Sequence, residues 1–392
     1  MKIVFVCPFG LSPKYTSSGR ALPLAQALAQ RGYHVRVVIP PWDRPVDSGR
    51  SFEQGGVEVE HVKLSGVRGV GHAAIVGSLL RATVQTRSDV IHVFKPKGYS
   101  GCVALALWHL RRARLVRAHI VLDTDDWEGT GGWNERGGYG FLARRLFAWQ
   151  ERWGLTHCDA VTAASGTLQS LAWACGAPRV RHVPNGLTAL PSRVPRALAR
   201  AQLGLAERGP LALVYTRFVE IGPDHLAELL QAVAERIPSL HLLVVGRGFG
   251  DELARLQDRA AALLRAGRLR LAGWVEPERL PLYWSAADFA LYACEDELLT
   301  RAKSPLRLVE MMGAGLPVVA HGVGEAAFYL EDHVSGRVVA PGDDAAFVSA
   351  AEQLAADDQL RARMGENARA HIATRFLWRE LAEGVEGLYG SL

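Results

Sequence analysis

Short apolar segments that predict buried strands alternate with helical segments from the first residues of the chain onward. The first strand is predicted at Lys2–Cys7, the first helix at Ala21–Gln30 and the second strand at Val35–Ile39. Such alternation is typical of parallel sheets whose strands are connected by crossover helices. The pattern starts again at Leu211–Tyr215, after the segment Pro191–Arg200, which we interpret as a linker. A chain of 392 residues accommodates two domains of ordinary size, so we expect two α/β domains.

The remaining elements follow the same alternation. Further strands are predicted at Val57–Val62, Val90–Phe94, Ala160–Ala164, Leu240–Val245 and Leu269–Ala272, and further helices at Ala73–Val84, Phe141–Thr156 and Gly166–Cys175.

Membrane-spanning and disulfide-rich classes do not fit this sequence. The apolar segment Ile3–Cys7 is shorter than the apolar region of a secretory signal peptide, and we interpret it as a strand. No apolar run approaches the roughly 20 residues of a membrane-spanning helix. The five cysteines form no C-x-x-C pair, so neither a zinc site nor a disulfide scaffold is indicated. We therefore expect a cytoplasmic protein.

The charge is distributed unevenly along the chain. Up to Leu190 there are 23 Lys and Arg against 13 Asp and Glu, and the remainder has 22 against 27. The basic first half suits anionic lipid, a phosphorylated acceptor or nucleic acid, although a solvated arginine-rich surface is the alternative. No nucleic-acid module is recognisable, so we expect no such partner. The helix at Ala73–Val84 belongs either to the core or to a membrane-touching surface.

One segment of the second half combines a predicted helix start with a positive charge. Ser304 is a favourable N-cap, and Pro305 and Leu306 suit the first turn. The unpaired N–H groups of a helix start attract anions, and Lys303 directly before them adds a charge. Glu310 follows about 7–8 Å along the helix axis, level with the ribose of a nucleotide whose diphosphate is bound at the start. A solvated surface helix is the alternative interpretation.

The run Glu310-Met-Met-Gly-Ala-Gly-Leu-Pro-Val-Val-Ala320, followed by Gly322-Val-Gly-Glu325, resembles the donor-binding core of glycosyltransferase family 4. Pro184-Asn185-Gly186 is similar to the motif that closes the first domain of that family. The resemblance extends over nearly the whole chain and implies retaining, nucleotide-sugar-dependent transfer that needs no metal for donor binding.

The resemblance also implies a domain plan. Family 4 enzymes have the α/β GT-B fold, in which two Rossmann-like domains face each other across a cleft. We accordingly place an acceptor-binding domain at residues 1–190 and a nucleotide-sugar donor-binding domain at residues 191–372. The last helix, residues 373–392, is expected to pack back on the N-terminal domain.

Donor-binding roles follow from the family's motifs. The family's glutamate at the Glu310 position holds the donor ribose, and its arginine at the Arg217 position holds the diphosphate. The remaining expected donor contacts are Gly19, Gly246, Trp274, Val275, Lys303, Ser304, Pro305 and Leu306.

Two positions depart from the family's pattern. The lysine that accompanies the arginine is missing near Ile221, and the first of two paired glutamates is replaced by Ala302. The nearby acids Glu295–Glu297 are candidates to replace that glutamate. We predict that Lys303 supplies the second cation for the leaving diphosphate, beside Arg217.

The first half carries candidate acceptor contacts at strand ends. Lys95 and Lys97 follow the strand at Val90–Phe94, where an open α/β sheet faces its ligand crevice, and are candidates for an anionic acceptor group. The next strand ends in Asp123-Thr-Asp-Asp-Trp127. Asp125 and Asp126 are interpreted as catalytic-site contacts to the sugar or acceptor, and Trp127 as an acceptor contact.

A metal site is the alternative for these acids. A D-x-D motif at a strand end can hold a divalent cation on a nucleotide diphosphate, with Asp123, Asp125 and Asp126 as ligands. The family resemblance favours no metal. The glycine-rich Gly129–Gly140 that follows is expected to be a mobile acceptor loop.

The expected function is transfer of a sugar from a nucleoside-diphosphate sugar to the hydroxyl of a sugar, lipid-linked or small-molecule acceptor. No cofactor is expected besides this donor substrate. The basic first domain suggests peripheral contact with the inner face of the membrane. A non-catalytic binding protein and a GT-B nucleotide-sugar epimerase are the alternatives.

Overall fold

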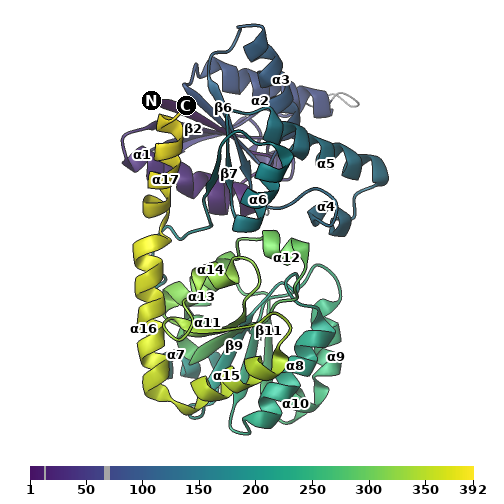
Figure 1. Cartoon of the computed structure of the whole chain (residues 1–392). Coiled ribbons are helices and arrows are strands. Elements are labelled where there is room, and N and C mark those ends of the chain that lie inside the picture. Colours follow the sequence, from purple (N-terminus) through teal and green to yellow (C-terminus); the bar gives the residue numbers. More distant parts are fainter. Residues whose placement is uncertain (13–14, 66–70) are drawn as a thin grey trace. The chain divides into compact units, whose positions relative to one another are not determined.

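The computed structural model describes residues 1–12, 15–65 and 71–392, which form two compact α/β units (Figure 1). Unit 1 contains Met1–Thr188, Ala302–Ser304 and Trp378–Leu392, and unit 2 contains Ala189–Arg301 and Pro305–Leu377. The sequence placed the boundaries after residues 190 and 372. The second boundary lies later because helix α16 (Asp358–Arg375) continues without a break, so the C-terminal segment of unit 1 starts at Trp378.

Unit 1 is built on a sheet with the strand order β3-β4-β2-β1-β5-β6-β7-β8. All neighbouring strands are parallel except β3 and β4. The strands are β1 (Lys2–Val6), β2 (His34–Ile39), β3 (Ser51–Gln54), β4 (Val57–His61), β5 (Val90–Phe94), β6 (His119–Thr124), β7 (Ala160–Ala163) and β8 (Val180–His182). From β1 the chain first builds one side of the sheet and then returns to β5 on the other side, so the strand order reverses between β1 and β5.

Helices cover both faces of this sheet. The longer ones are α1 (Leu22–Gln30), α2 (Gly71–Gln85), α3 (Tyr99–Arg112), α5 (Phe141–Thr156), α6 (Gly166–Cys175) and α17 (Trp378–Gly390), and the short ones are η1 (Thr16–Ala21), η2 (Pro45–Asp47) and α4 (Trp133–Arg136). Helix α3 packs against both α2 and α5. The predicted helix at 141–156 has the observed bounds, whereas the short polar strands β3 and β8 were missed.

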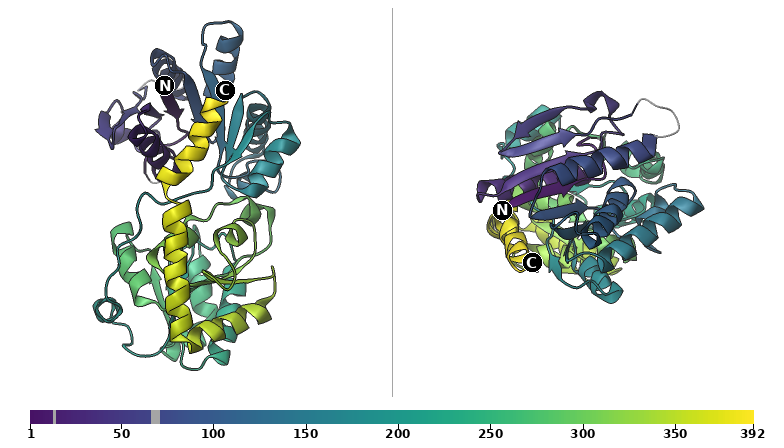
Figure 2. Two further views of the ribbon diagram at one scale, coloured as in Figure 1. Left: turned by 60° about the vertical axis from the view of Figure 1, so that its left-hand side comes forward. Right: turned by 90° about the horizontal axis from the view of Figure 1, so that it is seen from above.

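The last helix completes the core of unit 1. The four residues of α17 that are buried in the core, against α1 and the sheet, are Trp378, Ala382, Val385 and Tyr389. Figure 2 shows the ribbon of this last helix, in yellow, beside the start of the chain. The hydroxyl of Tyr389 lies 2.6 Å from Nδ1 of buried His92 on β5. Helix α17 therefore belongs to the core of unit 1.

Unit 2 has a fully parallel sheet with the order β11-β10-β9-β12-β13-β14. Its strands are β9 (Leu211–Tyr215), β10 (His241–Val245), β11 (Leu269–Gly273), β12 (Phe289–Tyr292), β13 (Val318–His321) and β14 (Gly336–Val339). Its helices, besides α16, are α7 (Arg196–Leu203), α8 (Pro223–Arg236), α9 (Glu252–Arg259), α10 (Ala261–Arg265), η3 (Pro277–Arg279), α11 (Leu280–Ala286), α12 (Leu298–Ala302), α13 (Leu306–Ala314), α14 (Ala326–Tyr329) and α15 (Asp344–Ala356). The strand order reverses between β9 and β12.

The structure changes the prediction for the linker and decides between the alternatives left open for the helix at Ala73–Val84. Part of the predicted linker, Pro191–Arg200, belongs to α7. Helix α2 buries Ile75 and Leu79, and its exposed positions carry small or polar residues such as Gly77 and Arg81, which favours its interpretation as a core helix. Across the described ranges, no helix is both long and apolar enough to cross a membrane.

Candidate active site

The topology of unit 2 locates its ligand crevice. In open parallel α/β sheets, ligands bind beyond the carboxyl ends of the strands where the strand order reverses. In unit 2 this point lies between β9 and β12, so the loops that follow Tyr215 and Tyr292 border it. Phe218, in the loop after β9, has a φ of +57°. Such a conformation is costly for a bulky residue and occurs often at binding sites.

Helix α13 begins later than predicted. Its first residue is Leu306 and its N-cap is Pro305, which has no capping side chain. Ser304 is not the cap, because its Oγ accepts a hydrogen bond of 2.8 Å from the backbone N–H of Asn185. The side chain of Asn185 also donates to the carbonyl of Ser304. The predicted hydroxyl cap is therefore wrong, since a contact 119 residues away in sequence engages that hydroxyl.

Glu310 is half-buried one turn into α13. Burial raises the pKa of its carboxyl to about 7, and the positive charge of Arg307 partly opposes this shift. A carboxylate that lacks water accepts hydrogen bonds from ligand hydroxyls without competition. This placement suits the predicted ribose contact.

Arg307 is a candidate site residue that the sequence did not reveal. Its guanidinium donates a hydrogen bond of 2.6 Å to buried Glu220 and lies 5.8 Å from the ring centroid of Tyr215. Burial disfavours the guanidinium charge, but Glu220 outweighs that effect and raises the pKa of Arg307. The Nε–H of Arg307 is buried and has no hydrogen-bond acceptor among the residues that the structure describes. The spacing of three residues to Glu310 was the only signal in the sequence, because Glu220 is 87 residues away.

The other predicted donor contacts of unit 2 lie in the loops that follow its strands. Arg217 is half-buried, with its guanidinium 4.5 Å from the ring centroid of Phe249. Gly246 has a φ of +113°, and a Cβ there would come within 1.9 Å of the carbonyl oxygen of Thr216. Only glycine permits this crossing of the two loops.

The residues after β11 differ in burial. Trp274 is 55% exposed and donates from Nε1 to Glu276, whereas Val275 is buried. A ring exposed to this extent presents a surface on which a ligand can stack.

The acids proposed to replace the missing glutamate already have partners. Glu295 accepts a hydrogen bond from the backbone N–H of Gly222, and Asp296 forms a bidentate ion pair with Arg301. Ala302 is buried, and its carbonyl accepts a hydrogen bond of 2.8 Å from Ser165. These contacts identify no side chain that directly replaces the glutamate missing at Ala302.

The reversal point of unit 1 contains a second charged cluster. Lys95 follows β5 with a φ of +48°, and its ammonium is 2.5 Å from Asp126 and 3.2 Å from Asp125. Burial by itself disfavours the ammonium, but Asp125 and Asp126 outweigh it and raise the pKa of Lys95 well above its usual value. Lys97 is also buried and pairs with Glu128 at 2.8 Å. Both lysines thus meet protein carboxylates, which the sequence prediction of an anionic acceptor contact did not include.

A buried carboxyl supports this cluster from α5. Glu151 accepts hydrogen bonds from the backbone N–H of Glu128 at 2.7 Å and from the hydroxyl of Thr124 at 3.0 Å. Burial, and then the charge of Glu128, raise the pKa of Glu151 to about 8. The group is therefore mostly protonated at neutral pH. No feature of the sequence near Glu151 distinguished it from a solvated helix residue.

The acids of the D-x-D motif contact cationic and hydroxyl side chains of the protein. Asp123 is fully buried and forms a bidentate pair with Arg20 at 2.7 and 2.8 Å. Asp125 accepts a hydrogen bond from Thr16 and also faces Lys95. Within the described residues, no group of His, Cys, Asp and Glu has a metal-binding arrangement. Protein cations thus already contact each of the three acids considered as metal ligands.

Three further predicted residues lie around this cluster. Gly19 is buried in η1, where a Cβ would overlap the ring of Tyr15. Trp127 is buried and donates from Nε1 to the carbonyl of Thr130, and the following loop contains the short helix α4. Lys303 lies 4.6 Å from the ring centroid of Trp133. Burial opposes the charge of Asp126, but Lys95 and then Lys303 outweigh it and lower the pKa of Asp126.

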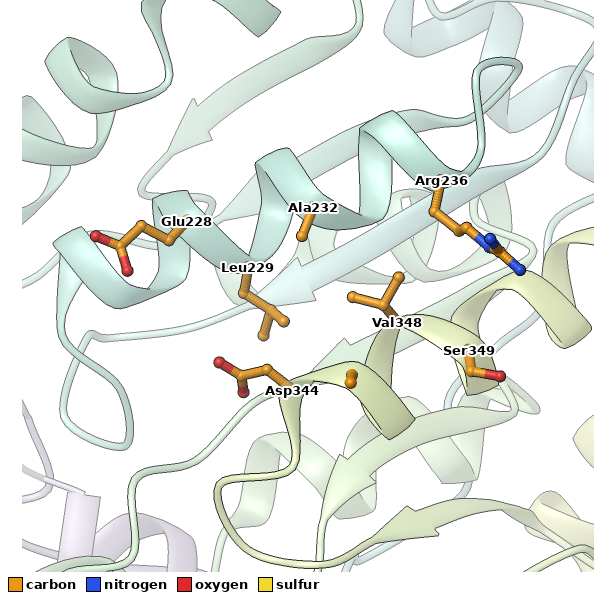
Figure 3. Close-up of a pocket in the computed structure, with 8 residues that line it drawn as sticks. Glu228, Leu229, Ala232, Arg236, Asp344, Val348 and Ser349 are labelled. Atoms are coloured by element: carbon orange, nitrogen blue, oxygen red, sulfur yellow. The ribbon is translucent and has the colours of Figure 1, made fainter.

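A separate groove of about 570 Å³ lies between α8 and α15 (Figure 3). Leu229 and Val348 project into it, with Asp344 and Arg236 at its margins. None of the lining residues is a predicted site residue, so we do not assign the groove to the active site.

Two parts of the chain match known protein families. Residues 195–371 match the family described as "Glycosyl transferases group 1", and residues 18–186 match "Glycosyl transferase 4-like domain". The chain belongs to the family 4-like glycosyltransferases. This confirms the membership that the run after Glu310 indicated.

Individual relatives of the family cover different shares of the chain. Lipopolysaccharide core biosynthesis glycosyltransferase LpsE of Rhizobium meliloti is 31% identical over 46% of this chain and 49% of its own length. The chain spans about half or less of the length of LpsE and of two D-inositol 3-phosphate glycosyltransferases, from Salinispora arenicola and Streptomyces griseus. Phosphatidyl-myo-inositol mannosyltransferase of Mycobacterium leprae is 26% identical over 99% of this chain and 96% of its own.

Solved structures of the family share the fold. The structure of Anabaena Alr3699/HepE in complex with UDP-glucose superimposes with a TM-score of 0.70 at 20% identity and covers all of both chains. The predicted GT-B fold class is thereby confirmed.

Proposed function

We propose that this chain is a glycosyltransferase that moves a sugar from a nucleoside-diphosphate sugar to an acceptor hydroxyl. The observation that carries the proposal is the pair Arg307 and Glu310 on α13. A buried guanidinium with an unpaired Nε–H lies one turn before a half-buried carboxyl, at the reversal point of the unit 2 sheet. The guanidinium suits a diphosphate oxygen, and the carboxylate suits the ribose hydroxyls.

The charges in unit 2 fit the demands of the transfer step. As the bond between sugar and diphosphate breaks, negative charge develops on the leaving nucleoside diphosphate. Arg217 and Arg307 are the cations of unit 2 that we assign to this charge. Groups aimed at developing charge in a site shielded from water are usually the largest source of rate enhancement.

We propose a retaining reaction in which no metal ion is needed to bind the donor. The family resemblance supports retention, and the pairing of Asp123, Asp125 and Asp126 with Arg20 and Lys95 supports metal independence. The acceptor hydroxyl would attack on the face from which the diphosphate leaves.

The acceptor is proposed to be a sugar or a lipid-linked molecule. Two relatives are named for lipopolysaccharide core and for phosphatidyl-myo-inositol, and the basic first half of this chain fits an acceptor near an anionic membrane face. The related structure with UDP-glucose makes uridine nucleotides the first donors to test.

A thermal-shift screen against nucleoside diphosphates and their sugars tests donor binding. A ligand at 100 times its dissociation constant adds about 2.7 kcal/mol to the free energy of unfolding. A donor found in this way is then incubated with acceptors. Binding without release of nucleoside diphosphate would favour the non-catalytic alternative, and consumption of donor without acceptor would favour the epimerase.

A further inference from the structure

Helix α5 exposes a continuous apolar stripe. Its members repeat at helical spacings of four, three and four residues and are Leu142, Leu146, Trp149 and Trp153. Leu142 is 81% exposed, and Leu146 and Trp149 are each 47% exposed. Side chains at these spacings lie on one face of a helix. The stripe therefore presents large apolar groups to solvent along the length of the helix.

The core of unit 1 does not use this stripe. The buried residues of α5 lie off the stripe, and Glu151 and Leu155 among them lie roughly opposite to it. Gln150 contacts the backbone of Gly98, and Glu151 supports the lysine–carboxylate cluster described above. Figure 1 shows α5 at the outer edge of unit 1.

Exposed arginines of α5 lie beside the stripe. Arg145 and Arg152 are exposed, and Arg145 lies 5.0 Å from the ring centroid of Phe141. The only acidic residue of α5 is Glu151, which is buried. We call the surface of α5 formed by Leu142, Arg145, Leu146, Trp149, Arg152 and Trp153 the α5 face.

The end of α3 extends the same pattern. Trp108 contacts Trp153 with ring centroids 5.6 Å apart, and Arg112 lies 5.0 Å from the ring centroid of Trp108. Leu115, just after α3, is 71% exposed. Apolar and aromatic groups thus alternate with arginines across two neighbouring helices.

We propose that the α5 face docks on an anionic lipid surface. An exposed helix with Trp and Leu on one side, arginine beside them and no exposed acid matches helices that lie in the membrane interface. The apolar side chains would enter the boundary between headgroups and acyl chains, and Arg145 and Arg152 would meet lipid phosphates. The charge complementarity favours anionic lipid over a protein partner, and the proposal does not depend on the transfer reaction.

Vesicle flotation tests the proposal with the full chain and without donor or acceptor. The wild type is expected to bind mixed phosphatidylcholine–phosphatidylglycerol vesicles more strongly than pure phosphatidylcholine. Each replacement in Leu142→Glu/Leu146→Glu should lower the partition coefficient about tenfold, because burial of a leucine is lost. Arg145→Gln should lower it about fivefold on the anionic vesicles, since one arginine near such a surface contributes about that factor.

Matched controls lie in unit 2. Leu198 is exposed to 49% on α7, and Arg265 is exposed at the end of α10, so Leu198→Glu and Arg265→Gln should leave binding unchanged. Unchanged thermal unfolding would show that the variants fold. Wild-type binding by the α5 variants, or equal binding to neutral and anionic vesicles, would overturn the proposal. Absence of vesicle binding together with dimers that Leu142→Glu/Leu146→Glu dissociates would assign the face to a second copy of this chain instead.

Discussion

Arg307 donates a hydrogen bond of 2.6 Å to Glu220, although the two residues are 87 positions apart in the chain. The pair connects the loop after β9 with the first turn of α13, and both side chains are largely withdrawn from water. Glu220 raises the pKa of the Arg307 guanidinium and holds it in one orientation. The Nε–H of Arg307 stays available to a ligand oxygen. The pair therefore fixes the position of the cation that we propose for the donor diphosphate.

Replacement of Arg307 should separate catalysis from folding. Arg307→Met should lower turnover about a hundredfold, in line with the loss of one electrostatic stabiliser. It should also destabilise the fold by about 3–5 kcal/mol, because Glu220 is left as an uncompensated buried charge. Steady-state kinetics and chemical denaturation measure the two effects.

The double variant Arg307→Met/Glu220→Gln is the control for folding. It should recover most of the stability without recovering turnover. Arg307→Lys should retain part of the activity. If the double variant turned over at the wild-type rate, Arg307 would have no role beyond structure.

Donor affinity should depend on pH through Glu310. The carboxylate is the form that accepts hydrogen bonds from both ribose hydroxyls, and its pKa is about 7. Affinity for the nucleotide sugar should therefore fall as the pH drops below about 7, by up to tenfold per unit. Calorimetric titrations at several pH values measure this dependence.

Glu310→Gln provides the matched comparison. The variant should bind donor about 1.5–3 kcal/mol more weakly at pH 8 and should show no such pH dependence. An identical pH profile in the variant and the wild type would remove Glu310 from the ribose contact.

Lys303 remains a predicted cation for the leaving group. It directly precedes Ser304 and Pro305 at the entry to α13, and its ammonium contacts Trp133. Lys303→Met should lower turnover about a hundredfold and change the Michaelis constants less, because developing charge is a property of the transition state. Lys303→Arg should keep part of the rate. Near-normal turnover of Lys303→Met would leave the diphosphate to the arginines alone.

The stability of unit 1 should depend on protonation of Glu151. The folded-state pKa of about 8 lies above the usual 4.5, so folding takes up a proton between these values. This contribution to the free energy of unfolding is complete below about pH 4.5 and is lost as the pH rises through about 8. We choose pH 6 to 9 because this range spans the pKa of Glu151. Chemical denaturation over this range should show that the free energy of unfolding declines as the pH rises.

Glutamine reproduces the hydrogen bonds of the protonated acid. Its carbonyl can accept from Glu128 N–H while its amide donates to Thr124. Glu151→Gln should therefore fold with nearly wild-type stability at pH 6 and lose less stability on the way to pH 9. An equally steep decline in the variant and the wild type would show that Glu151 is already ionised in the folded protein.

The sequence predicted features that depend on local pattern. The helix at 141–156 was placed with its observed bounds because glycine precedes it and its apolar spacing is regular. The strands β3 and β8 were missed, since β3 is exposed and polar and forms only by pairing with β4. Pairing partners in the sheet lie outside the range of local propensity.

The charged pairs of the site could not be predicted from the sequence because they also join residues that are far apart in the chain. Lys95 was interpreted as a cation for the acceptor, but the register that pairs Phe94 with Asp123 brings the end of β5 beside the acids that follow β6. Ser304 was interpreted as a cap, but Asn185 engages its hydroxyl. The family motif identified Glu310, whereas Arg307 became a candidate only when Glu220 was found beside it.

Release of nucleoside diphosphate, measured with a bound nucleotide sugar and EDTA in the presence and absence of acceptor, tests the central claim most directly. A metal-independent glycosyltransferase should release the diphosphate only when the acceptor is present, and EDTA should not change the rate. Release without acceptor, no release despite donor binding, or loss of release in EDTA that manganese restores would contradict this account.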